Sequence, residues 1–184
     1  MIVSDPTGIM SKKSYSQQFV DYILSRCSDP GSRAAMKRAD NPITEYQSWD
    51  ILAGFSVDLE NEDRRLAHAL ISSALARSDR QKNGMAGIGR SIASCYSDGN
   101  QDDQAKAKLR RLLACSSIPE LCRVLRPIFS LVNSRSNIGL DYAKLLDQIL
   151  RFQSPTQRER VKAAWAQDFY GKILGSMGGE EGGE

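Results

Sequence analysis

The chain has 184 residues, of which 41% are hydrophobic and 26% are charged, as is typical of a globular protein that buries one full core or two small ones. No run approaches the roughly 20 apolar residues that a membrane span requires, and residues 1–13 lack the apolar centre of a signal peptide. We therefore expect a cytoplasmic protein with no membrane partner. The four cysteines form no CxxC pair and predict neither a metal site nor a disulfide.

The formal net charge of +3 conceals an uneven distribution of charge. Three of the 22 acidic residues lie in the Gly/Glu tail 175–184, which we expect to be disordered. Residues 1–174 then carry 25 basic and 19 acidic groups, a net charge of +6. Between Lys106 and Arg126, six basic residues face only Glu120. This imbalance favours a polyanionic partner, although charge on a solvated helix face is the common alternative.

Apolar residues recur at intervals of three and four along the whole chain, and no run alternates between apolar and polar residues. This periodicity predicts an all-α protein with two small helical-bundle lobes, residues 13–96 and 104–174. The polar stretch 97–103 is the predicted seam between the lobes. We expect helices at about residues 14–26, 32–39, 45–55, 61–77, 85–94, 104–115, 117–132 and 140–152, and from residue 155 onwards.

Two prolines have different predicted effects. Pro127 interrupts the amphipathic pattern of residues 117–132, and it should kink that helix or start a new one, because proline removes a backbone donor and crowds the preceding turn. Ser154 and Pro155 should open the last helix as its N-cap and first-turn proline. The apolar stripe of that helix consists of Val161, Trp165, Phe169 and Ile173.

The sequence does not indicate a catalytic centre. Its single histidine, His68, has no serine or cysteine partner marked by a motif, and we interpret it as a partly exposed helix residue. Acidic pairs such as Asp102 and Asp103 occur at predicted helix starts, where carboxylates favour the helix dipole, and they do not gather the ligands that magnesium requires. We therefore expect no enzyme activity and no cofactor.

The glycine-rich segment 84–89 has neither the spacing of a dinucleotide-binding loop nor the Gly-Lys-Ser/Thr end of a P-loop, and no strand precedes it. We predict instead that its glycines let the start of a helix approach a neighbouring helix or backbone closely. Arg90 follows one turn into this helix. It is either a salt-bridged surface residue or a phosphate contact.

A series of short segments, taken together, is typical of one family. The segments are residues 34–39, Gly89-Arg90, Lys108 to Leu113, Leu125-Arg126, residues 140–146 and 149–152, Ser154-Pro155 and Trp165 to Tyr170. In order and spacing they resemble the CasB family, the small subunit of the type I-E CRISPR surveillance complex Cascade. The resemblance covers about residues 31–171. The chain departs from the family pattern at Met36-Lys37, where Leu-Arg is frequent, and at Gly87-Ile88, where Ser-Leu is usual.

The resemblance implies a non-catalytic, two-lobed helical protein that acts in antiviral defence. It would be present as a pair of copies, would contact the backbone and large subunits, and would lie near crRNA and target DNA. Its basic surface would bind nucleic acid without sequence specificity and help to hold the displaced strand of the R-loop. The expected phosphate contacts are Lys37, Arg38, Arg65, Arg90, Lys108, Arg111 and Arg126, with Arg158 and Arg160 as extensions.

Two alternatives come from other classes of protein. In the first, the chain is a purely structural adaptor whose arginines bridge acidic patches on partner proteins, with no nucleic-acid contact. In the second, it is a small helical regulator of transcription, which is disfavoured because no short helix-turn-helix with a base-reading second helix is apparent.

Overall fold

The computed structural model describes residues 13–78 and 80–171. The predicted tail 175–184 and Ile173 lie outside these residues. Within them the chain forms helices and no strand; the only β-type pairing is an isolated bridge between Ala86 and Leu140. The predicted all-α class is confirmed. The elements are α1 (Tyr15–Arg26), α2 (Pro30–Lys37), η1 (Glu45–Ser48), α3 (Trp49–Gly54), α4 (Glu62–Arg77), α5 (Ile88–Ala93), η2 (Gly99–Gln101), α6 (Asp103–Leu113), α7 (Ile118–Arg135), α8 (Tyr142–Leu150), η3 (Arg151–Gln153) and α9 (Pro155–Tyr170).

Local capping explains where most of these helices begin. Short polar side chains accept hydrogen bonds from first-turn backbone N–H groups, which would otherwise lack partners at a helix start. The capping residues are Ser14, Asp29, Asn61, Asp102, Ser117 and Asp141. Ser154 occupies the predicted N-cap position of α9, with Pro155 in the first turn, but its side chain makes no capping hydrogen bond.

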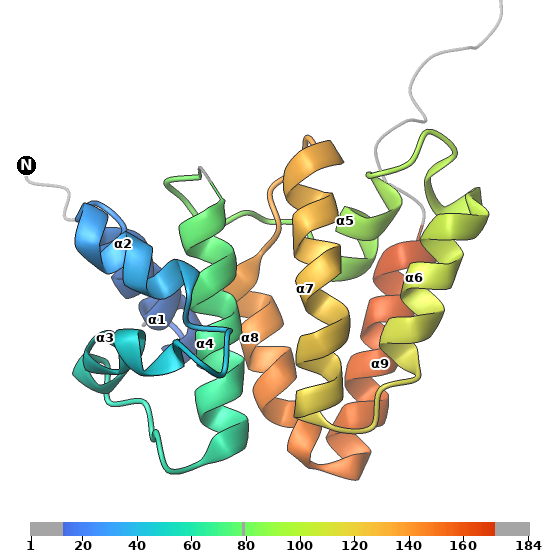
Figure 1. Ribbon diagram of the computed structural model, residues 1–184. Helices are drawn as coiled ribbons and strands as arrows, with labels where there is room; N and C mark the ends of the chain where they lie inside the picture. Colours follow the sequence, from blue (N-terminus) through green and yellow to red (C-terminus); the bar gives the residue numbers. More distant parts are fainter. Residues whose placement is uncertain (1–12, 79, 172–184) are drawn as a thin grey trace, which may run out of the picture.

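Helix α4 lies at the centre of the molecule, where it packs against α1, α2, α7 and α8. Residues 67–76 of this helix are all buried, because neighbouring helices cover it on several sides. Figure 1 shows α1, α2 and α3 on one side of α4, and α5, α6 and α9 on the far side of α7. One continuous cluster of buried apolar residues runs through both sides. The division into lobes at residues 97–103 therefore stays a prediction.

Helix α7 continues from Ile118 to Arg135 with Pro127 inside it. No second helix begins at Pro127, so that predicted outcome is wrong. The apolar face of α7 is buried on both sides of the proline, at Leu125, Ile128 and Phe129, whereas Pro127 itself is exposed. Packing of this face offsets the roughly 3 kcal/mol that an internal proline costs a helix.

The contact between α5 and α9 depends on glycine. A Cβ atom on Gly89 would lie 2.6 Å from the backbone nitrogen of Phe169, and one on Gly87 would lie 2.6 Å from the carboxyl carbon of Asp168. At position 89 the obstructing atoms belong to the backbone of α9, so this position requires glycine, whereas at position 87 the Asp168 side chain would have to shift. The Asp168 carboxylate in turn accepts a hydrogen bond from the backbone N–H of Arg90, at 2.9 Å, near the start of α5. The predicted close approach is confirmed.

His68 is fully buried, so its interpretation as a partly exposed residue is wrong. Its Nδ1 lies 2.6 Å from the Arg64 carbonyl oxygen, which fixes the proton on that nitrogen, and its Nε2 accepts from the Tyr15 hydroxyl at 3.0 Å. Its ring also meets the ring of Phe19 edge to face. Burial lowers the pKa of His68 to about 4, so the imidazole is neutral at pH 7.

Candidate nucleic-acid interface

A basic groove lies between α6 and α7. Three cations line it: Lys108 and Arg111 from α6, and Arg123 from α7. Its volume is about 410 Å³, and Val124, Pro127 and Ile128 contribute apolar surface to its lining. Lys108 and Arg111 occupy the groove because Ala105, Leu109 and Leu112 bury the opposite stripe of α6 in the core. We call this site the α6–α7 groove.

The cations of the α6–α7 groove have few internal partners. The side chains of Lys108, Arg111 and Arg123 make no hydrogen bond or ion pair with any residue that the structure describes. Among the described residues of the lining, Glu120 is the one acid, and it accepts hydrogen bonds from the backbone N–H and hydroxyl of Ser116, at 2.8 and 2.9 Å. These bonds lower the pKa of Glu120, so it is ionised at neutral pH. Three positive charges therefore face one negative charge.

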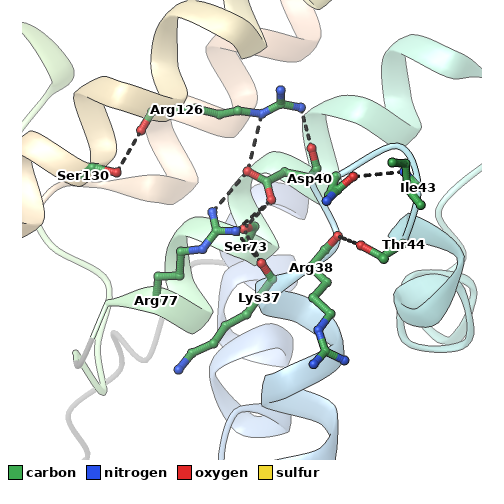
Figure 2. Close-up of polar contacts among 10 residues, drawn as sticks. Lys37, Arg38, Asp40, Ile43, Thr44, Ser73, Arg77, Arg126 and Ser130 are labelled. Carbon is green, nitrogen blue, oxygen red and sulfur yellow. Dashed lines mark hydrogen bonds and ion pairs between the residues drawn. The ribbon is translucent and has the colours of Figure 1, made fainter.

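Arg126, one turn further along α7, has a different environment. Its Nη2 donates to the Asp40 carbonyl oxygen at 2.5 Å, and its Nε lies 3.4 Å from Asp40 Oδ2. Asp40 also receives both terminal nitrogens of Arg77, at 3.1 Å each, and the hydroxyl of Ser73, at 2.9 Å. Figure 2 shows these four residues, which we call the Asp40 junction. The junction ties the chain after α2 to α4 and α7.

Lys37 and Arg38 precede the Asp40 junction at the end of α2, and both side chains are exposed. The Lys37 carbonyl oxygen accepts from Arg77 at 2.5 Å, whereas its ammonium group extends away from Asp40 (Figure 2). The Arg38 guanidinium donates to Gln47 at 3.1 Å. These two cations remain accessible to an external anion.

Arg65 is held inside the fold. Its Nη1 donates to the Leu59 carbonyl oxygen at 2.6 Å, and its Nε lies 3.5 Å from the half-buried carboxylate of Glu45. This geometry joins α4 to η1 and to the loop before α4. The described contacts give Arg65 a structural role, and its predicted contact with phosphate is not tested by them.

The remaining predicted contacts lie on α5 and α9. Arg90 is exposed and lines a second cleft beside Tyr96 and Asp98. Arg158 donates to the Ser116 carbonyl oxygen and lies over the ring of Phe152, which places it at the α6–α7 loop, beside the end of the groove. Arg160 is exposed on α9.

Across residues 13–78 and 80–171, no three His, Cys, Asp or Glu side chains are grouped so that they could hold a metal ion. In the same part of the chain, no helix combines the length and the apolar character that crossing a bilayer requires.

Comparison with known proteins bears on the identity of the chain. Residues 32–170 match the family described as CRISPR-associated protein Cse2. The chain belongs to this family. A Cse2 relative from Thermus thermophilus is 30% identical over 110 residues, which are 60% of this chain and 59% of the relative. The aligned part thus spans less than two thirds of the relative's length.

Solved Cse2 and CasB structures share the fold of the chain. A Cse2-family protein from Thermus thermophilus has a TM-score of 0.71 and 23% identity, with 87% of this chain and 100% of that chain covered. CasB from Thermobifida fusca has a TM-score of 0.67 and 21% identity, with 86% of this chain and 99% of that chain covered. A chain in a CRISPR RNA-guided surveillance complex has a TM-score of 0.64 and 21% identity, with 85% of this chain and 94% of that chain covered. The resemblance to the CasB family inferred from the sequence is confirmed.

Within this Cse2-family chain, the structure gathers some predicted residues and separates others. It brings Lys108 and Arg111 together and adds Arg123, which was not among the predicted contacts. Arg123 belongs to the basic segment between Lys106 and Arg126, so the charge imbalance of that segment includes it. The spacing of residues along α7 does not show that Arg123 faces α6. Likewise, nothing in the local sequence links Asp40 to Arg126, 86 residues away.

Proposed function

We propose that this Cse2-family chain is the non-catalytic small subunit of a CRISPR RNA-guided surveillance complex, in which its α6–α7 groove holds nucleic-acid phosphates without reading sequence. Family membership and the structural likeness to a chain of such a complex support the first part. The second part depends on one observation: Lys108, Arg111 and Arg123 converge on one groove, and their side chains make no hydrogen bond or ion pair with the residues that the structure describes.

The chemistry of the groove suits a phosphate backbone. Lysine and arginine bind phosphate oxygens through charge-assisted hydrogen bonds, and such contacts position a strand but do not specify its sequence. In RNA-guided recognition, base pairing reads the sequence, and R-loop formation is nearly balanced in free energy. A modest number of phosphate contacts is therefore enough to favour the open R-loop. Its expected partners are crRNA, the displaced strand of the target DNA, the other subunits and a second copy of the chain.

The adaptor alternative has an observation of its own in favour. Ile43, Tyr46 and Trp49 expose 82%, 61% and 38% of their surface and follow one another at three-residue intervals around η1. Tyrosine and tryptophan are enriched at the centres of protein interfaces. This face suits a protein partner, and a subunit of a large complex needs such a face whether or not it also contacts nucleic acid.

A salt titration of binding to labelled single-stranded DNA tests the proposal. The full chain should bind several unrelated sequences equally and lose affinity steeply as salt rises. Lys108→Ala/Arg111→Ala should reduce the slope of log affinity against log salt by about 1.4, because each phosphate contact to a single strand contributes about 0.7. These two residues are preferred to Arg126, whose loss would also disturb the Asp40 junction.

The control is Arg135→Ala/Lys144→Ala, which removes the same charge from exposed positions outside the groove. If both double variants reduce binding equally, net charge rather than the groove is responsible. Two results together would favour the adaptor function instead. The wild-type chain would not bind DNA at low salt, and the groove variant would still assemble with its partner subunits into a complex that retains DNA normally.

A further inference from the structure

The Asp40 junction holds two arginines from different helices on one buried carboxylate. The Asp40 side chain is only 7% exposed, whereas the side chains of Arg77 and Arg126 are 49% and 35% exposed. Two guanidinium groups and one carboxylate leave a net charge of +1. Because the negative charge lies beneath the two positive charges, an approaching anion meets the guanidinium groups first.

The hydrogen bonds of the junction leave donors for an external partner. A guanidinium group carries five N–H donors, and an ionised carboxylate only accepts. Arg126 turns Nη2 and Nε toward Asp40, and no residue that the structure describes accepts a hydrogen bond from its Nη1. In Figure 2 one terminal nitrogen of Arg126 points away from Asp40. Arg77 likewise faces Asp40 and the Lys37 carbonyl with its two terminal nitrogens and leaves its Nε unused.

We propose that Asp40 is a positioning residue for nucleic-acid binding, which orients Arg77 and Arg126 so that together they bind one phosphate group. The proposal rests on the proposed function and adds Arg77 as a phosphate contact. Fixing a guanidinium group in advance reduces the conformational entropy that is lost when it binds phosphate. Asp40 itself touches no nucleic acid, so its effect is indirect.

Asp40→Asn separates positioning from net charge, because the two predict opposite signs. Removing a carboxylate some 8 Å from a phosphate should tighten binding by about twofold if only charge matters. If Asp40 positions the arginines, binding should weaken about fivefold, because an amide offers N–H donors to the guanidinium groups and cannot hold both of them. Asp103→Asn is the matched control, since Asp103 is fully exposed at the start of α6.

The experiment measures binding of the full chain to labelled single-stranded DNA by fluorescence anisotropy, for wild type, Asp40→Asn, Asp103→Asn, Arg126→Gln and Asp40→Asn/Arg126→Gln. Circular dichroism melting establishes that each variant is folded. We expect Asp40→Asn to weaken binding about fivefold in the wild-type background and less than about twofold beside Arg126→Gln, since part of its effect acts through Arg126. Asp103→Asn should leave binding unchanged or tighten it slightly.

Unchanged or tighter binding by folded Asp40→Asn overturns the inference and leaves the proposed function intact. The inference is also overturned if Asp40→Asn/Arg126→Gln binds about fivefold more weakly than Arg126→Gln alone. Absence of binding by the wild-type chain overturns both. If Asp40→Asn does not fold, Arg126→Lys takes its place: it keeps the charge but loses the fork of donors, so several-fold weaker binding supports positioning and wild-type binding refutes it.

Discussion

The Asp40 junction and the α6–α7 groove contain the same kinds of basic residue in different surroundings. At the junction, Arg77 and Arg126 donate to a buried carboxylate and to backbone carbonyls. In the groove, Lys108 and Arg111 have no such acceptors among the described residues. A cation with an internal acceptor stabilises the fold, whereas one without an acceptor retains its full capacity for an external anion. The comparison predicts that changes at the junction affect both stability and binding, whereas changes in the groove affect binding alone.

The largest expected effect concerns the side of the molecule that contains the junction, where α4 also buries His68. The folded-state pKa of about 4 lies below the ordinary 6.5, so the unfolded chain binds a proton that the folded chain excludes. Above about pH 6.5, His68 does not reduce the free energy of unfolding. As the pH falls to 4, the free energy of unfolding decreases by about 3 kcal/mol, because the unfolded chain gains the proton that the folded chain excludes. Urea unfolding at several pH values measures this loss. This loss of stability at low pH should be absent from His68→Gln. A pH profile of His68→Gln identical to that of the wild type would contradict the prediction.

Truncation at the junction should have the next largest effect. Asp40→Ala leaves two partly buried guanidinium groups without their counter-charge and should lower the free energy of unfolding by about 2.5 kcal/mol. Urea denaturation at pH 7 measures the change. Asp103→Ala, which removes an exposed carboxylate, should change the free energy by less than about 0.5 kcal/mol. Equal effects of the two variants would show that the junction does not stabilise the fold.

Arg65 offers a second test of an internally paired cation. Arg65→Ala removes the donor to the Leu59 carbonyl and leaves Glu45, whose side chain is 17% exposed, without its ion-pair partner. We expect a loss of about 1.5 kcal/mol in thermal or urea unfolding. The neighbouring Arg64 is exposed, so Arg64→Ala should cost less than about 0.5 kcal/mol. A cost at Arg64 as large as that at Arg65 would remove the distinction between paired and free cations.

The smallest effect on stability is expected in the groove. Lys108→Ala/Arg111→Ala should change the free energy of unfolding by no more than about 0.5 kcal/mol, because neither side chain has an acceptor among the residues that the structure describes. The same variant should weaken binding to single-stranded DNA about tenfold at low salt, since two phosphate contacts are lost. A large loss of stability with unchanged binding would reverse the assignment of the two regions.

Much of the fold could be predicted from the sequence, because helix formation depends on local periodicity and capping. The apolar spacing of α6 is a local signal, and the helix that it predicts at residues 104–115 agrees with the structure, Asp103–Leu113, within two residues. The same local reasoning predicts that Pro127 interrupts the helix. Its effect was decided by burial of the rest of α7 against other helices, which no window around residue 127 contains.

The candidate site was only partly predictable. The basic segment from Lys106 to Arg126 indicated a surface for a polyanion, and it supplies all three cations of the groove. Arg126, at the end of that segment, could not be distinguished from Lys108 by composition. The difference between them is Asp40, which follows a different helix and meets Arg126 only when α2, α4 and α7 pack together.

By itself, the sequence determined the all-α class, most helix starts, the excess of positive charge and the resemblance to the CasB family. These properties are local, or they are sums over the chain. Tertiary structure alone decided which cations are paired, that His68 is buried and neutral, and that Gly89 lies against α9. Each of these depends on the distance between residues far apart in the sequence, and packing of the core sets that distance.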